Sequence, residues 1–185
     1  MIKRQTAKDY LTQSAIELFS KEKIEKITVK EICANCGLST RTFYKYYKDK
    51  YDLMNNCFEN EIENYFASSD TPKCLYTFLL FSANVICERS SFFSNVFCYT
   101  GQNNIRQGLE VPIRKQYIKI IQEYFYDDVT LDVYNAITFF IKGQLAYVEE
   151  SIRKTEIPSA EASVEYFINA IPFCLVKYLY PVEEK

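Results

Sequence analysis

The segment between Ile27 and Leu53 carries the start and stop signals of two short helices separated by one glycine. Thr28 and Glu31 have the spacing of a capping box, in which the hydroxyl accepts a hydrogen bond from the backbone three residues on and the carboxylate reaches back. This spacing predicts a helix over residues 29–35. The side chains that it would bury, at helical spacing, are Val29, Ile32 and Cys33.

A turn and a second short helix follow. Gly37 supplies the backbone conformation that bends the chain, and Leu38 is an apolar plug behind the turn. Ser39 is a good N-cap because its side-chain oxygen can accept a hydrogen bond from a free helix N–H. The second helix is therefore expected over residues 40–46, and the whole pattern predicts a helix-turn-helix.

The second helix has two unlike faces. Phe43 and Tyr47, four residues apart, face inward, whereas Arg41 and Lys45 point the opposite way. Two outward cations suit the major groove of DNA, where Arg can donate two bonds to a guanine edge and Lys can reach phosphate. An ordinary helical hairpin with a solvated polar face has the same periodicity, so the spacing alone leaves both interpretations open.

The next helix begins beside the same surface. Lys48 and Lys50 supply cations there, and the free backbone N–H groups at a helix start bind phosphate. Thr42 can touch a thymine methyl group, and Tyr44 can reach phosphate. We therefore predict DNA contacts by ten residues: Thr28, Lys30, Ser39, Thr40, Arg41, Thr42, Tyr44, Lys45, Lys48 and Lys50.

Residues 8–53 resemble the DNA-binding domain of the TetR family of transcriptional regulators. The resemblance is carried, in this order and spacing, by Ala15, Leu18, Phe19, Thr28, Val29, Ile32, Gly37, Leu38, Ser39, Thr42, Phe43, Tyr44, Tyr47, Lys50 and Leu53. Two positions depart from the family pattern: Lys23 stands where a Gly is usual, and the aromatic at Tyr47 is more often Phe. The resemblance also implies weak phosphate contacts by Lys3 and Arg4.

Composition favours a second helical domain behind the first. The 185 residues include only 4 Gly and 5 Pro, and 48% are hydrophobic, which is typical of a mostly helical core. Residues 1–56 hold 11 Lys and Arg against 7 Asp and Glu, whereas residues 57–185 hold 11 against 17. A basic first part fits nucleic-acid binding by that part alone, although chance can produce such a difference. We predict an all-α fold of about nine helices, with a helix-turn-helix domain at 1–48 and a helical ligand-binding and dimerisation domain at 49–185.

Cysteine and histidine usage argues against a metal centre and against an enzyme. Cys33 and Cys36 form a C-x2-C pair, but the chain has no second such pair and no His, so the usual four-ligand zinc site cannot be assembled. The absence of His also removes the commonest general base. No apolar leader or membrane span is evident, so we expect a cytoplasmic protein with reduced thiols, no membrane association, no metal and no cofactor.

Apolar spacing and turn signals place the other helices. They are expected over residues 3–21, 49–66, 73–89, 92–99, 105–126, 130–154 and 159–180. Pro112 is expected to start or kink the helix that contains it, and Pro172 to kink the last one.

Dimerisation is a geometric requirement for binding a palindromic operator, because two copies of the DNA-binding helix must lie about 34–36 Å apart. The family places a four-helix dimer interface at its last two helices, and Gly143 and Ala146 would permit close backbone approach. The apolar faces of these two helices could instead pack on the core of their own domain. The predicted interface residues are Ile137, Phe140, Ile141, Gln144, Leu145, Val148, Phe167, Ile171, Cys174, Leu175 and Tyr178.

The signal that the protein responds to is less constrained. Members of the resembled family bind a small molecule among the middle helices, and the supply of aromatic residues here suits an apolar or aromatic ligand. The candidate lining residues are Phe81, Phe97, Tyr117, Tyr124 and Phe139, all of which could equally be plain core. The resemblance thus implies a dimeric repressor that such a ligand releases from its operator. A weaker similarity, to regulators of dihydroxyacetone-kinase operons, leaves a protein partner as the alternative signal.

Overall fold

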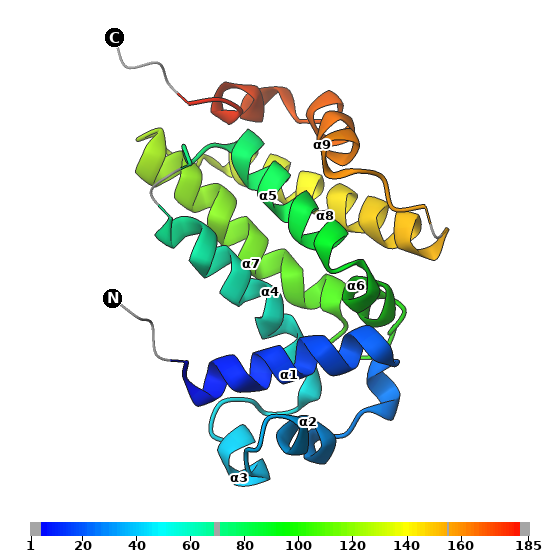
Figure 1. Cartoon of the computed structure of the whole chain (residues 1–185). Coiled ribbons are helices and arrows are strands. Elements are labelled where there is room, and N and C mark those ends of the chain that lie inside the picture. Colours follow the sequence, from blue (N-terminus) through cyan, green and yellow to red (C-terminus); the bar gives the residue numbers. More distant parts are fainter. Residues whose placement is uncertain (1–4, 69–70, 155, 182–185) are drawn as a thin grey trace. The chain divides into compact units, whose positions relative to one another are not determined.

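The computed structural model describes residues 5–68, 71–154 and 156–181, and every regular element in these ranges is helical, as predicted (Figure 1). The α-helices are α1 (Ala7–Lys21), α2 (Val29–Asn35), α3 (Thr40–Phe43), α4 (Lys50–Ala67), α5 (Leu75–Glu88), α6 (Ser90–Phe97), α7 (Ile105–Lys119), α8 (Leu131–Arg153) and α9 (Ala160–Asn169). Three helices are of other types: η1 (Ile24–Lys26) and η3 (Phe173–Tyr178) are 3-10 helices, and η2 (Ile120–Tyr124) is a π-helix.

The chain forms two compact units, each built from two segments. Unit 1 consists of Met1–Glu61 and Arg89–Gly108, and unit 2 of Ile62–Glu88 and Leu109–Lys185. These units differ from the predicted division at residue 48, because the first part of α4 and all of α6 pack with the helix-turn-helix. Local sequence signals could not reveal the packing of α6, since it lies far from α1 in the chain.

Unit 1 is organised around α1. Thr6 caps this helix in a complete capping box with Asp9, and α6 packs against it. The Phe19 and Phe92 ring centroids lie 6.3 Å apart, and the Asn95 side-chain amide donates to the Phe19 carbonyl at 2.8 Å. This bond satisfies one of the carbonyls that the end of α1 leaves without a helical partner.

Unit 2 has an aromatic core between helices α5, α7 and α8. Phe78 and Tyr117 meet edge to face with centroids 5.9 Å apart, and Tyr117 meets Phe140 at 6.2 Å in the same way. α5 also packs on α9, and η3 packs on α8. Among the described residues, no helix combines the length and the apolar character that a membrane crossing requires.

The last helix is shorter than predicted. α9 ends at Asn169 instead of continuing to residue 180, and Pro172 precedes a separate 3-10 helix, η3. Proline lacks a backbone N–H and disfavours helical geometry in the residue before it, so the chain breaks here where we expected a kink. Pro112, in contrast, lies inside α7, which ends in η2.

Candidate nucleic-acid interface

The predicted turn between α2 and α3 is present in unit 1. Thr28 and Glu31 form both halves of the capping box of α2, with the Thr28 N–H donating to the Glu31 carboxylate at 2.7 Å. Gly37 adopts a φ of 69°, in the left-handed region that glycine occupies without strain. The Ser39 hydroxyl accepts from the Thr42 N–H at 3.1 Å and so caps α3. The sequence prediction of this turn is confirmed.

The segment that we call the reading segment, residues 40–47, starts as α3 and continues as tight turns. The regular helix ends at Phe43, three residues earlier than predicted. The Tyr46 and Tyr47 N–H groups nevertheless both donate to the Phe43 carbonyl, at 2.9 and 3.1 Å. The segment therefore keeps a helical path that places Tyr47 below Phe43.

Two aromatic rings anchor the reading segment. Phe43 and Tyr47 are buried, and their ring centroids are 5.7 Å apart. Ile32 and Cys33 of α2 are buried in the same unit, and the Ser14 hydroxyl of α1 donates to the Ile32 carbonyl at 2.8 Å. Because the apolar side of the segment is fixed to α1 and α2, its polar side faces outward.

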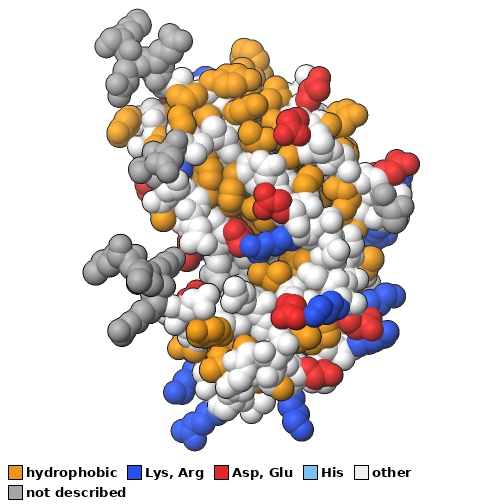
Figure 2. Space-filling view, in the orientation of Figure 1, with side chains coloured by type: hydrophobic (Ala, Val, Ile, Leu, Met, Phe, Trp, Pro, Cys, Tyr) orange, Lys and Arg blue, Asp and Glu red, His pale blue; other side chains and the backbone are white. Residues whose placement is uncertain are grey.

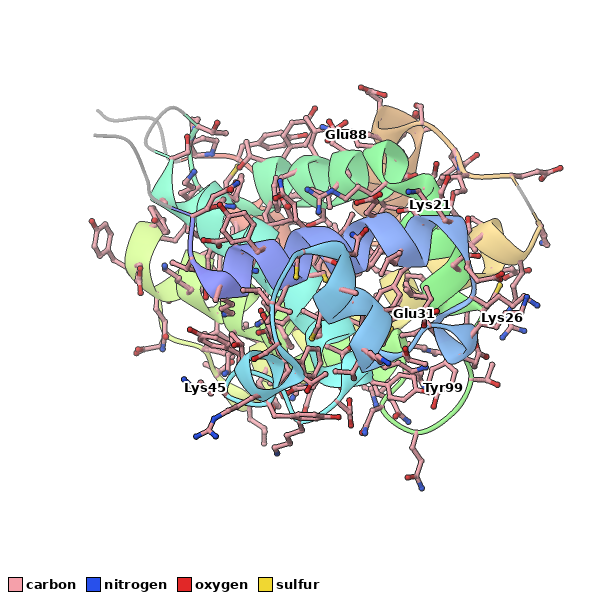
Figure 3. The ribbon with its side chains drawn as sticks, turned by 60° about the horizontal axis from the view of Figure 1, so that its bottom comes forward. Lys21, Lys26, Glu31, Lys45, Glu88 and Tyr99 are labelled. Atoms are coloured by element: carbon pink, nitrogen blue, oxygen red, sulfur yellow. The ribbon has the colours of Figure 1, made fainter. Side chains whose placement is uncertain are left out.

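The outward side carries most of the predicted DNA contacts. Lys and Arg side chains project from the end of unit 1 that α2 and α3 form, and Lys45 points away from the helices (Figures 2 and 3). Tyr44 is 60% exposed. Of the ten predicted residues, Thr42 and Lys50 are half-buried, and the others are exposed: Thr28, Lys30, Ser39, Thr40, Arg41, Tyr44, Lys45 and Lys48.

Lys50 departs from its predicted role as a phosphate contact. Its ammonium donates to the carbonyl oxygens of Ile24, Glu25 and Ile27, at 2.6, 3.1 and 2.7 Å. Burial holds the pKa of this amine below its ordinary value, against the opposing influence of the Glu25 and Glu31 charges. All three N–H donors are occupied, so Lys50 closes the turn around η1 and is not presented to a ligand.

The start of α4 also differs from the prediction of free N–H groups. The Asp49 carboxylate accepts from the Tyr51 and Asp52 N–H groups at 2.8 and 2.9 Å, and the Asp52 carboxylate accepts from the Lys48 N–H at 3.0 Å. Two carboxylates thus occupy the place that a phosphate would take. The Lys48 side chain remains exposed beside them.

Tyr46 belongs to the outward side although it was not among the predicted contacts, and two predicted contacts fall outside the described residues. Tyr46 is exposed between Lys45 and the buried Tyr47. Neighbouring residues of a helix point about 100° apart, so two successive tyrosines could not both be anchors, and this signal would have assigned Tyr46 to the surface. Lys3 and Arg4 lie outside the described residues.

The cysteine pair packs at the end of α2. Cys33 is buried, and the Cys36 thiol donates to the Ile32 carbonyl at 3.3 Å. Burial raises the pKa of the Cys33 thiol, which favours the neutral form over the thiolate that binds metals. Over the described ranges, no group of three or more potential metal ligands occurs.

The predicted dimer residues belong largely to the core of unit 2. Six are buried in their own chain: Ile137, Phe140, Ile141, Leu145, Leu175 and Tyr178. The other five, which are Gln144, Val148, Phe167, Ile171 and Cys174, are half-buried. The burial of these six residues in their own chain favours the alternative, packing on their own core.

A neighbouring stripe of α8 faces solvent instead. Phe139 is 78% exposed, Gly143 has open space where a side chain would stand, and Tyr147, one turn later, is half-buried. The Tyr147 ring lies 5.7 Å from that of Tyr166 on α9, which is also exposed. We call Phe139, Gly143, Tyr147 and Tyr166 the outer stripe.

The five predicted ligand residues are divided between the two units. Phe97 belongs to unit 1, whereas the other four belong to unit 2. Tyr117 is buried and its hydroxyl donates to Gln144 at 3.1 Å, but Phe139 faces solvent. Phe81 stacks on Tyr65 with centroids 4.6 Å apart.

Tyr124 lines an open hollow of about 600 Å³ in unit 2. The other described residues that line it are Phe66, Ala67, Ser68, Thr71, Pro72 and Lys73.

An anchored reading segment, a glycine turn and an outward polar side form a helix-turn-helix, an arrangement typical of DNA-binding proteins. Residues 11–57 match the family model described as "Bacterial regulatory proteins, tetR family". This part of the chain is therefore similar to the DNA-binding part of the bacterial tetR-family regulators.

Two solved structures show the same fold over most of the chain. The first, "Dihydroxyacetone kinase operon activator DhaS", is 18% identical with a TM-score of 0.67, and the match covers 92% of this chain and 97% of that one. The second is a TetR transcriptional regulator from Rhodococcus sp. RHA1, at 14% identity and a TM-score of 0.64, covering 93% and 98%. No curated protein matches significantly.

Proposed function

We propose that the protein binds a palindromic DNA operator as a homodimer through its reading segment and thereby represses transcription. The observation that carries this proposal is the two-sided reading segment. Phe43 and Tyr47 are fully or almost fully buried, while Arg41, Tyr44 and Lys45 are exposed on the other side. A helical segment held in this way can enter a major groove without losing its anchors.

The side chains divide into base readers and phosphate contacts. Arg41 can donate two bonds to a guanine edge, and Thr42 can contact a thymine methyl group. Lys45, Lys48 and Tyr44 can reach phosphates on either side of the groove. The proposed contact surface is completed at the helix starts by Thr28, Lys30, Ser39 and Thr40. Lys50 is left out of it because its ammonium is bound to backbone carbonyls.

The outer stripe is the better candidate for the dimer interface. The exposed rings of Phe139 and Tyr166 would be covered by a partner, and the lack of a side chain at Gly143 lets a second helix approach closely. α8 and α9 both contribute to the stripe, so two copies would form a four-helix contact. We assign DNA binding to residues 1–48, and dimerisation and effector response to residues 49–185.

The hollow at Tyr124 is our candidate effector site. Its volume of about 600 Å³ lies in the range of small-molecule sites, and Phe66 and Tyr124 supply aromatic walls. A small apolar or aromatic ligand would release the repressor by favouring the conformation whose two reading segments mismatch the operator.

Selection of bound fragments from a random DNA pool tests the core of the proposal. We expect the purified protein to enrich a palindrome, and we expect Arg41→Ala to lose about 1–3 kcal/mol of preference for it over random duplex. Enrichment of no sequence would refute the function. Equal loss on both duplexes for Arg41→Ala would refute the base-reading role alone.

The alternative is an activator whose second domain responds to a protein partner. The chain shares its fold with a protein described as an operon activator, so activation is worth testing beside repression. Transcription in vitro from a promoter that carries the selected sequence separates the two: repression by the protein alone supports the first proposal, and stimulation supports the second.

A further inference from the structure

The Tyr47 hydroxyl lies inside a partly buried chain of hydrogen bonds that joins three parts of unit 1. It donates to the Asn56 side-chain carbonyl of α4 at 2.9 Å and lies 3.4 Å from the Thr12 hydroxyl of α1. The Asn60 amide, also on α4, donates to the Thr12 hydroxyl at 3.1 Å. Tyr47 is 4% exposed and Thr12 is 7% exposed, whereas Asn56 and Asn60 are half-buried, so the Thr12–Tyr47 contact is the one best shielded from water.

The donors and acceptors along this chain can be assigned. A tyrosine hydroxyl has one hydrogen, and Tyr47 gives it to Asn56, so Thr12 must donate its own hydrogen to the Tyr47 oxygen. Thr12 in turn accepts from Asn60. The order is therefore Asn60 to Thr12 to Tyr47 to Asn56, in which each hydroxyl both donates and accepts, and each bond polarises the next.

The environment of Tyr47 agrees with this assignment. Burial raises the pKa of its hydroxyl to about 12, and the hydrogen bond from Thr12 opposes that rise, as a donor to the phenolic oxygen would. The group is thus neutral at physiological pH and keeps the hydrogen that it donates to Asn56.

We propose that the Tyr47 hydroxyl positions the reading segment on α1 and α4, and that this position determines how well the protein discriminates its operator. The inference rests on the proposed function. Tyr47 is too deeply buried to touch DNA, so any effect of its hydroxyl on DNA reaches the duplex through the position of Arg41 and Lys45. The rings of Phe43 and Tyr47 hold the segment by shape, whereas the hydroxyl sets its rotation through directional bonds.

Tyr47→Phe is the direct test, because it removes one oxygen and keeps the ring. We expect its affinity for the selected duplex to fall at least about fivefold, as when one base contact is misaligned, and its affinity for random duplex to change less than about twofold. The salt dependence should stay that of the wild type, since no phosphate contact is removed. Both affinities are measured by fluorescence anisotropy at a temperature at which both proteins are fully folded.

Thr12→Val and Thr12→Ser form a second, matched pair. Valine has the shape of threonine without the hydroxyl, so Thr12→Val should lose discrimination as Tyr47→Phe does. Thr12→Ser retains a hydroxyl and should behave as the wild type. This rescue separates the hydrogen-bond chain from the packing of the side chain.

Tyr65→Phe controls for the general cost of removing a buried hydroxyl. Tyr65 is 8% exposed in unit 2 and bonds to the Thr77 hydroxyl at 2.8 Å, so the loss is similar in kind but lies outside unit 1. If Tyr47→Phe binds the selected duplex as tightly as the wild type, or if Tyr65→Phe loses as much affinity as Tyr47→Phe, the inference is overturned while the proposed function stands. A wild-type protein that selects no sequence would refute the proposed function, and the inference with it.

Discussion

Replacing Lys50 by Met distinguishes a structural lysine from a phosphate contact. The substitution keeps an unbranched apolar stem and deletes only the ammonium, which donates to the carbonyls of Ile24, Glu25 and Ile27. A hydrogen bond from a charged donor contributes about 1.5–3 kcal/mol, but these carbonyls lie in a partly exposed turn that water can reach after the change. We therefore expect a net loss of about 2–4 kcal/mol in the free energy of unfolding.

Urea denaturation followed by circular dichroism measures this loss, and salt titration of DNA binding supplies the second readout. For Lys50→Met the slope of log affinity against log salt should stay that of the wild type. Lys45→Met is the matched control: its side chain is exposed, so we expect stability within about 0.5 kcal/mol of wild type and a salt slope reduced by about 0.9. An unchanged stability for Lys50→Met together with a reduced slope would show that Lys50 binds phosphate.

Three further predictions follow from single positions. Phe139→Glu should leave the fold intact and convert the dimer to a monomer in sedimentation equilibrium, whereas a persisting dimer would exclude the outer stripe. Gly37→Ala should cost about 1 kcal/mol in urea denaturation, because a side chain at a φ of 69° is strained although no neighbour obstructs it; an unchanged midpoint would contradict this. The hydrogen bond with Thr28 holds the pKa of Glu31 below its ordinary 4.5, so the capping box contributes stability above that pH and loses it as the pH falls through the lowered value. The stability difference between wild type and Glu31→Ala should therefore shrink between pH 7 and pH 3, and a constant difference would refute the assignment.

The helix-turn-helix could be predicted because its signals are short-range. The capping box joins Thr28 to Glu31, and the Ser39 cap joins residues three apart, so each bond forms whenever the local chain adopts the expected turn. Gly37 acts through its own φ alone. The burial of Phe43 and Tyr47 likewise followed from helical periodicity.

The same locality explains the errors in the candidate site. Lys50 carries a charge that suits phosphate, and only the fold brings carbonyl acceptors from residues 24–27 within 3.1 Å of its amine. The N–H groups at the start of α4 were expected to be free because nothing in the pattern shows which way the Asp49 and Asp52 carboxylates turn.

The amino-acid sequence by itself determined the all-helical class, the turn at Gly37 and the two-sided reading segment, since each depends on residues within one or two helical turns. Only the tertiary structure decided which stripe of α8 is buried. Ile137 and Phe140 pack inside unit 2 while Phe139 faces solvent, and apolar residues on both sides of a helix give periodicity no means of choosing between them. That choice depends on contacts with α7 and η3, which are distant along the chain.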